Sequence, residues 1–364
     1  MTIHQLDTPA LVVDLDIMER NLCRVADYAR SHGLRLRPHT KTHKTPALAR
    51  RQLDLGAAGL TVAKVGEAEV MLQAEPEDIL VAYPVLGPAK LARLMAVAQQ
   101  ARVTVALDSL DAARQLSDAA SAASLEIGVL VEFDAGLGRM GVVPGEDLID
   151  LARQVRSLPS LRFEGIACYA GHVKRMDDEG QEKFAHFSRL LESVCAAFER
   201  AHIDLPVVSA GSTPTLFHSH LAPSLNEIRP GTYIFNDRNT VESGACAAED
   251  CAATMIVTVV SNARQGRVMI DGGSKTFSSD RPTAASDVTF GWLVGEPAVR
   301  FFQMNEEHGY LDTSLSGRSF AVGERLRIIP NHVCVAMNLH ETVYGIRGET
   351  VECSWTVAAR GKLQ

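Results

Sequence analysis

The sequence lacks the features that would assign it to a membrane, a secretory pathway or a nucleic acid. No apolar run is long enough to span a bilayer, and residues 1–5 lack the basic and apolar segments of a secretory signal. Positive charge is in deficit, because 36 lysines and arginines stand against 44 acidic residues, a net charge of −8. Such a chain has no general attraction for phosphate backbones. We therefore expect a cytoplasmic protein whose partner is a small molecule.

Disulfide spacings and paired-cysteine metal motifs are absent as well. The seven cysteines are odd in number and scattered, and no two of them form a Cys-x-x-Cys pair. This pattern is typical of reduced thiols in a cytoplasm. We expect six of them to be small buried hydrophobic residues, with Cys334 as the exception.

No Gly-x-Gly-x-x-Gly motif follows the first strand to support an open doubly wound sheet, which remains the alternative fold. The chain instead alternates short apolar runs with segments of helical periodicity. Eight strands separated mostly by helices favour an α/β fold with a (β/α)8 TIM-type barrel. The expected strands are 34–39, 60–63, 79–82, 103–107, 127–133, 163–169, 206–209 and 227–235.

The helical alternation stops near residue 250, and short strands at 255–260, 268–271, 326–329 and 342–346 follow. An initial strand at 8–14 precedes a helix that Asp16 is expected to cap and Gly33 to end. We therefore expect two domains. Residues 15–245 form the barrel, and residues 246–364 form a mostly β domain together with the N-terminal strand 1–14.

The stretch 37–44 contains two lysines and two histidines directly after the first barrel strand. Chemistry in such barrels lies at the carboxyl ends of the strands. On an extended chain Arg37, His39 and Lys41 share one face, and a partly desolvated lysine on the inward face can trap a carbonyl group. The alternative is a salt-bridged lysine at the rim, and His43 and Lys44 are expected to be supporting or solvated.

Two further loops offer polar side chains at the same edge. Loop 134–142 places three glycines around Arg139, which predicts a tight turn presenting a donor fork to an oxyanion. The strand 163–169 ends with Tyr169, a source of a hydroxyl, and is followed by His172, a general base or a stacking partner for a planar cofactor. A surface arginine and a structural histidine are the alternatives.

The loops after strands seven and eight contain small and hydroxyl residues, as a phosphate site in a barrel requires. They include Gly211, Ser212 and Thr213 in the first loop, and Arg229, Gly231, Thr232 and Tyr233 in the second.

In the β domain, His332 and Cys334 stand two residues apart, which on a strand would place two metal ligands on one face. Such a site would be completed by water or substrate. The alternative is a buried histidine beside a core cysteine. The polar segment 305–309 is expected to approach the pocket that contains His332 and Cys334.

Together these motifs resemble the fold-type III pyridoxal-phosphate enzymes, the alanine racemase-like group. Segments 38–44 and 330–334 narrow the resemblance to the branch of D-threonine aldolase and D-serine dehydratase. The resemblance implies that Lys41 binds pyridoxal 5'-phosphate covalently, that Arg139 lies near the ring oxygen and that Arg229 faces the pyridine edge. It further implies that residues 211–213, Gly231 and Thr232 hold the phosphate, that His332 and Cys334 bind a divalent metal (Mn²⁺, Mg²⁺ or Zn²⁺), and that the chain forms a homodimer.

The implied activity is a metal-dependent lyase that cleaves D-β-hydroxy-α-amino acids, of the D-threonine type, to glycine and an aldehyde. Segments 338–341 and 271–276 resemble the aldolase branch. Lys41 and His172 would be the catalytic residues. A D-serine or 3-hydroxy-D-aspartate dehydratase remains open, as do a non-catalytic pyridoxal-phosphate carrier and a sugar-phosphate barrel enzyme, and Cys334 favours Zn²⁺.

Overall fold

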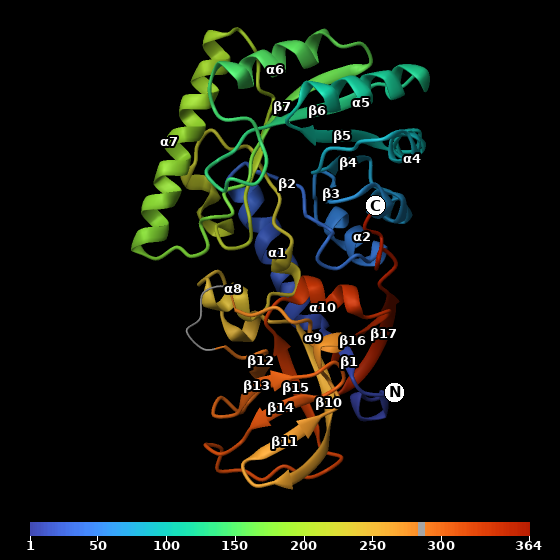
Figure 1. The fold of residues 1–364 in the computed structure, drawn as a ribbon, viewed down its shortest axis with the longest axis vertical. Coiled ribbons are helices and arrows are strands. Elements are labelled where there is room, and N and C mark those ends of the chain that lie inside the picture. The colour runs from blue at the N-terminus through green and yellow to red at the C-terminus, as the bar shows by residue number, and fades with distance from the viewer. Residues whose placement is uncertain (283–287) are drawn as a thin grey trace. The chain divides into compact units, whose positions relative to one another are not determined.

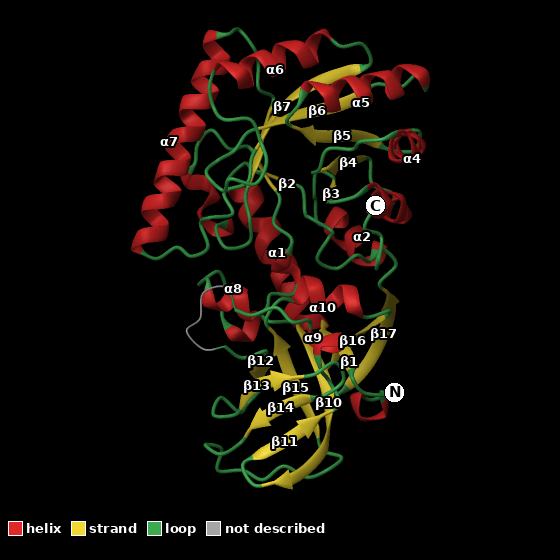
Figure 2. Cartoon of the chain, in the orientation of Figure 1, coloured by secondary structure: helices red, strands yellow, loops and turns green. Residues whose placement is uncertain are grey.

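The computed structural model describes residues 1–282 and 288–364 (Figure 1). The chain divides into two compact units. The barrel unit comprises Val25–Lys41, Pro46–Gly231 and Gly361–Gln364, and the β unit comprises Met1–Arg24, Thr42–Thr45 and Thr232–Arg360. Each unit contains its own sheet, coloured yellow in Figure 2.

The barrel unit is built on eight parallel strands in the order β2-β9-β8-β7-β6-β5-β4-β3. A parallel bridge between His39 and Thr61 joins the end of the β2 segment to β3, which closes the sheet. The prediction of a (β/α)8 barrel is confirmed. The strands are β2 Arg35–Leu36, β3 Leu60–Val62, β4 Asp78–Val81, β5 Arg102–Leu107, β6 Ile127–Glu132, β7 Leu161–Ala167, β8 Val207–Ala210 and β9 Glu227–Ile228.

Helices connect most of these strands, and local sequence explains their ends. The Ser109 hydroxyl accepts from Ala112 N at the start of α5, and Asp177 Oδ1 accepts from Gly180 N at the start of α7. Within the described residues, no helix is both long and apolar enough to cross a bilayer. The helices are α1 Leu15–Ser31, α2 Pro46–Asp54, α3 Val65–Met71, α4 Pro88–Ala98, α5 Leu110–Ala122, α6 Glu146–Ser157 and α7 Asp178–Arg200, and the 3-10 helix η3 Leu216–Leu221 follows β8.

A buried ion network occupies the barrel interior. Arg37 donates from Nε to Glu227 at 3.0 Å and from Nη1 to Asp78 at 2.6 Å, and all three side chains are less than a tenth exposed. An apolar cluster that includes Leu80 and Leu130 forms part of the core. The network satisfies the buried charges, because each carboxylate has a guanidinium partner.

The β unit contains a nine-stranded sheet in the order β11-β14-β13-β12-β15-β10-β1-β16-β17. Strand β1 is central and pairs antiparallel with β10 and parallel with β16. The strands are β1 Ala10–Asp14, β10 Ala253–Arg264, β11 Arg267–Ile270, β12 Gly291–Leu293, β13 Arg300–Met304, β14 Gly309–Asp312, β15 Arg325–Pro330, β16 Thr342–Arg347 and β17 Thr350–Thr356. Three short helices accompany them: α8 Arg238–Glu242, α9 Ser274–Phe277 and α10 Val333–Leu339.

The structure corrects three local predictions. Asp14, not Asp16, caps α1, because its Oδ1 accepts from the N–H groups of Asp16 and Ile17. The expected strand 227–235 ends at Ile228, and Thr232–Ile234 forms the 3-10 helix η4. His332 and Cys334 do not share a strand face: β15 ends at Pro330, His332 precedes α10, and Cys334 lies in its first turn.

Replacing Arg37 with methionine is expected to lower the free energy of unfolding by about 3–5 kcal/mol, because Asp78 and Glu227 would remain buried without their main partner. Urea unfolding followed by circular dichroism measures the change. The matched control is Arg153→Met, whose pairs with Glu146 and Asp150 are exposed and are expected to contribute far less to stability. Equal losses in the two variants would contradict a structural role for the network.

Candidate functional site

Lys41 follows the carboxyl end of β2, in a turn rather than on a strand. Its backbone N–H approaches His39 Nδ1 at 3.4 Å, and its side chain is exposed. That Lys41 is partly desolvated and traps a carbonyl group stays a prediction. The inward position belongs to Arg37, whose charge is neutralised in the interior network. His43 and Lys44, expected to be solvated or supporting, are both buried in the β unit.

Arg229 lies just beyond β9, at the barrel mouth, by which we mean the carboxyl ends of strands β2 to β9. Its Nη1 donates to Ser209 Oγ at 2.7 Å and its Nη2 donates to Cys168 O at 3.0 Å. Ser209 in turn donates to Glu227 Oε1 at 2.7 Å. The guanidinium is thus held by the ends of two neighbouring strands, and its position depends on the interior network.

Loop 134–142 after β6 is a closed turn with Arg139 near its tip. Asp134 Oδ1 accepts from three successive N–H groups of the loop, those of Gly136, Leu137 and Gly138, at 3.0 to 3.1 Å. Gly141 has φ +106°, and a Cβ there would lie 2.3 Å from the Phe133 carbonyl carbon, so only glycine fits. Because the loop is fixed in this way, Arg139 is held near the barrel mouth.

Tyr169 lies beside Arg139, as its place after β7 predicts. The Arg139 guanidinium carbon stands 4.9 Å from the centre of the Tyr169 ring, within the range of a cation–π interaction. Tyr169, Arg139 and Arg229 therefore come from three loops that follow strands of one barrel.

The segment after β8 can receive an anion. Gly211 has φ +93°, which only glycine adopts without strain. In the described chain the backbone N–H groups of Gly211, Ser212 and Thr213 donate to no protein acceptor. The Ser212 and Thr215 hydroxyls lie 3.2 Å apart. Free N–H donors with nearby hydroxyls fit a phosphate group, so the residues present are suitable for the phosphate of a cofactor.

His172 borders a recess of about 850 Å³ that is also lined by Asp134, Lys183 and His186. Its Nδ1 is buried without a hydrogen-bond partner among the described residues. Burial, followed by the positive charge of Lys183, lowers the pKa of His172 below the ordinary histidine value. The imidazole is therefore neutral at neutral pH and can accept a proton.

The remaining residues predicted for the cofactor belong to two different units. Gly231 is the last residue of its segment of the barrel unit, whereas Thr232 and Tyr233 belong to the β unit. Tyr233 is buried, and Thr232 Oγ1 lies 3.7 Å from Cys334 Sγ. Within the β unit, Thr232 therefore contacts the predicted metal-ligating thiol.

His332 and Cys334, here called the metal pair, lie close enough for each to shift the pKa of the other. Burial favours the neutral form of each, but their mutual attraction outweighs it, helped by Asp237 and Asp280 at His332 and by Thr42 at Cys334, so the pKa of His332 is raised and that of Cys334 is lowered. Thr42, the residue after Lys41, lies with its Oγ1 3.2 Å from Cys334 Sγ. The thiolate and imidazole are donors that Zn²⁺ accepts, so the pair fits a divalent metal.

With only His332 and Cys334 as protein ligands, a metal ion would keep open coordination positions. Among residues 1–282 and 288–364, no cluster of three or more His, Cys, Asp or Glu side chains is arranged to hold a metal ion. His332 Nδ1 lies 2.9 Å from Asp280 Oδ2, which orients the ring. Such an arrangement suits a metal whose coordination is completed by water or substrate.

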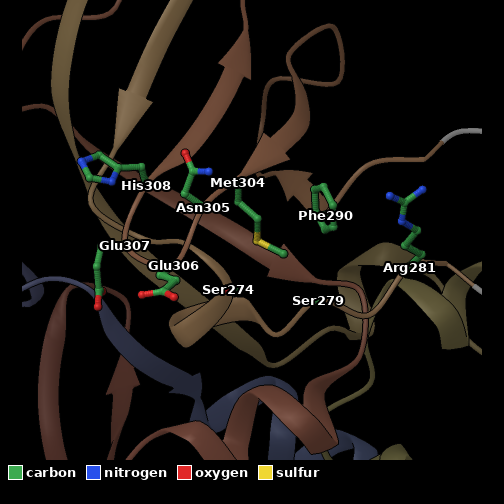
Figure 3. A pocket seen from close by; sticks show the side chains of 9 residues that line it. All are labelled: Ser274, Ser279, Arg281, Phe290, Met304, Asn305, Glu306, Glu307 and His308. Carbon is green, nitrogen blue, oxygen red and sulfur yellow. The ribbon is translucent and has the colours of Figure 1, made fainter.

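Segment 305–308 lines a recess of about 820 Å³ in the β unit. Figure 3 shows Arg281 and Phe290 at one end of the recess, and Asn305 and His308 at the other. Two of its lining residues, Ser279 and Arg281, flank Asp280, the partner of His332. The polar segment expected near the metal pair therefore lines a recess that also includes the neighbours of Asp280.

The segments that resembled the aldolase branch make a structural contact with each other. His340 Nε2 lies 3.1 Å from Thr276 O, which joins the end of α10 to α9. Burial lowers the pKa of His340, so the ring is neutral and donates to the carbonyl. This contact supports the helix that contains Cys334.

Sequence reasoning missed Asp237 and Glu132. Asp237 Oδ2 accepts from Val333 N and its Oδ1 from Thr240 N, both at 2.9 Å, so one buried carboxylate caps α8 and α10. Glu132 is a buried carboxylate at the end of β6. The signal in the sequence for each was an acidic residue within or beside an apolar segment, where a charge is costly without partners.

Two family models match the chain over consecutive stretches. The model described as "Alanine racemase, N-terminal domain" matches residues 13–239, and the one described as "Putative serine dehydratase domain" matches residues 252–346. A D-threonine aldolase from Arthrobacter sp. is 33% identical over 98% of this chain and 93% of that protein. A D-threo-3-hydroxyaspartate dehydratase from Delftia sp. (strain HT23) is 33% identical over 92% of each chain. The crystal structure of D-threonine aldolase from Filomicrobium marinum superimposes with a TM-score of 0.93, at 33% identity, covering 100% of this chain and 98% of that one.

A closed parallel barrel joined to a β unit, with these matches along its length, has the alanine racemase fold. The chain belongs to the alanine racemase N-terminal domain family and continues into a serine dehydratase-type domain. The resemblance to fold-type III pyridoxal-phosphate enzymes is confirmed, and with it the prediction of an enzyme that uses pyridoxal phosphate.

Replacing Asp237 with asparagine is expected to loosen the start of α10, because one amide oxygen cannot accept both backbone hydrogen bonds. We expect a loss of about 1–3 kcal/mol in stability and faster alkylation of Cys334 in metal-free protein. Thermal unfolding and mass-spectrometric labelling measure the two effects. The control is Asp177→Asn at the start of α7, where only one such bond is made. Unchanged labelling of Cys334 would contradict the capping role.

Proposed function

We propose that the protein is a pyridoxal-phosphate- and metal-dependent lyase that cleaves D-β-hydroxy-α-amino acids, of the D-threonine type, to glycine and an aldehyde. One observation supports it most directly: free N–H donors at 211–213 and the fixed Arg139 and Arg229 gather at the mouth of one barrel, where Lys41 follows β2. The similarity to D-threonine aldolases over nearly the whole chain supports the same reaction.

Each residue at the barrel mouth has a role that its chemistry allows. Lys41 binds the cofactor's carbonyl group, and the N–H groups of residues 211–213, with Gly231 and the Thr232 hydroxyl, bind the phosphate. Arg139 with Tyr169 and Arg229 would contact the ring, and Tyr233 is the remaining residue assigned to the cofactor. The cofactor supplies an electron sink for the bond cleavage.

The metal pair binds one divalent cation, and the thiolate of Cys334 favours Zn²⁺ over the harder Mn²⁺ and Mg²⁺. Thr42 and Thr232 each contact Cys334 Sγ through a hydroxyl and thereby orient it. A divalent metal held by this pair would supply Lewis acidity that makes a substrate hydroxyl more acidic. His172, neutral because of its lowered pKa, accepts the hydroxyl proton.

A dehydratase acting on D-serine or 3-hydroxy-D-aspartate is the second candidate. The observation in its favour is Cys334, because some aldolases of this branch are expected to have a carboxylate at this position. A D-threo-3-hydroxyaspartate dehydratase that is 33% identical to this chain supports the dehydratase reaction. A 3-hydroxy-D-aspartate aldolase from Paracoccus denitrificans, 32% identical, supports cleavage of a related substrate instead. In a dehydratase Lys41 would take the α-proton.

The protein is further proposed to be a cytoplasmic homodimer. All seven cysteines are free, which suits a reducing compartment. Light scattering coupled to size-exclusion chromatography at several concentrations tests the dimer, and a monomer at every concentration would refute it.

A product assay distinguishes the candidates. Purified protein is incubated with D-threonine, D-serine and D-threo-3-hydroxyaspartate, with and without a chelator. We expect glycine and an aldehyde in equal amounts from β-hydroxy substrates, with at least a tenfold loss after chelation. The matched variants are Lys41→Ala, which removes the visible absorbance of the bound cofactor, and Cys334→Ser, which retains it. Release of ammonia together with a keto acid would instead identify a dehydratase. Protein that keeps the absorbance of the bound cofactor but turns over none of the substrates would be a carrier.

The proposed role of His172 predicts a particular pH dependence. Since the pKa of His172 is lowered, the base form persists below the ordinary histidine value, and the acidic limb of kcat/KM is expected to have its midpoint below about 6.5. Lys183→Ala removes one of the causes of that lowering, so its midpoint is expected to rise toward 6.5. Arg189→Ala, in the same recess but not among the charges that shift His172, is the control. An acidic midpoint that is the same in Lys183→Ala as in the wild type would argue against His172 as the base.

A further inference from the structure

Glu132 is directed into the barrel. Side chains of a strand alternate, so Gly128, Leu130 and Glu132 of β6 share one face. A Cβ on Gly128 would lie 2.6 Å from the Glu164 carboxyl and 2.7 Å from Thr104 Oγ1 of the neighbouring strands. Leu130 packs in the apolar cluster with Leu80 and other strand residues. Glu132, the last residue of the strand, is therefore the inward residue at the barrel mouth.

Glu132 is only 6% exposed, so its carboxylate is charged only if the surroundings compensate it. The pKa of Glu132 is raised overall, because burial is the largest influence and Asp108 at the end of β5 adds to it, whereas Arg229 and Arg139 act in the opposite direction and favour the charged form. These are the charged groups that act on Glu132 from the neighbouring strand ends and from loop 134–142. The geometry places both arginines near this carboxylate: Glu132 pairs in register with Ala167, and the carbonyl of the next residue, Cys168, accepts from Arg229. The Glu132 carbonyl accepts from Val142 N, at the end of the loop that contains Arg139.

Neither arginine is neutralised by a direct ion pair in the described chain. Arg229 donates to the Ser209 hydroxyl and to the Cys168 carbonyl, and Arg139 lies over the Tyr169 ring. Glu132 is consequently the buried carboxylate that offsets both arginines through the field at the mouth rather than through a hydrogen bond.

We propose that Glu132 is a positioning residue whose buried carboxylate balances Arg139 and Arg229 and thereby sets the electrostatic potential at the cofactor ring. The inference rests on the proposed cofactor site. Without this negative charge the potential at the mouth becomes more positive, which disfavours protonation of the nitrogen atoms of the bound cofactor and of Lys41. Glu132 needs no contact with the substrate for this role.

The test is a pH titration of the absorbance of bound pyridoxal phosphate. In Glu132→Gln the midpoint is expected to fall by about one unit, because a positive potential favours the deprotonated form. Glu132→Asp retains the charge and is expected to titrate within about 0.3 unit of the wild type. Glu132→Leu is a second neutral variant, which avoids leaving a buried polar group, and is expected to shift as the glutamine variant does.

Glu164→Gln is the matched control. Glu164 is likewise a buried strand carboxylate, but it binds Thr104 and Arg162 rather than facing the arginines of the mouth. We expect lower thermal stability and an unchanged midpoint for this variant. If both neutral variants at position 132 titrate as the wild type does, or if Glu164→Gln shifts equally, the inference is overturned. If the wild type binds no pyridoxal phosphate, the proposed function fails instead, so the two failures are distinguishable.

Discussion

The barrel unit depends on one buried guanidinium, that of Arg37. It binds Asp78 and Glu227, and Glu227 also accepts from Ser209, which accepts from Arg229. A continuous chain of hydrogen bonds therefore runs from the interior of the barrel to its mouth. Because buried charges are costly unless each has its partners, the geometry of the network is narrowly defined. The direction of the Arg229 guanidinium is thus fixed by packing within the barrel.

The parts of the fold that follow local periodicity could be predicted from the sequence. Strands such as β4 to β8 are largely apolar runs between turn residues, and the fold follows from the alternation of strands with helices. The positions of Lys41, Arg139 and Arg229 in the segments after β2, β6 and β9 could be predicted as well, because the topology of a barrel brings such segments to one edge. For these residues, the position along the chain is sufficient to predict that they lie at one edge of the barrel, since neighbouring strands end at the same edge.

Other features depend on contacts between residues far apart in the sequence. The metal pair lies at the start of a helix because Asp237, 96 residues before Val333, accepts from its N–H group, and nothing in segment 330–334 indicates that partner. Arg37 and Lys41 appear in the sequence as members of one basic cluster. Only the structure separates the buried ion-paired residue from the exposed one, because burial is decided by the strands that surround Arg37.

The aldolase and dehydratase reactions require opposite protonation states beside the substrate. Retro-aldol cleavage needs a base that removes the hydroxyl proton, whereas elimination needs an acid that assists the departure of hydroxide. His172 has a lowered pKa and a buried Nδ1 without a partner in the described chain, so its neutral form predominates at neutral pH. A neutral imidazole is a base and a poor acid. The environment of this one side chain therefore suits the role of base that the proposed cleavage between Cα and Cβ assigns to it.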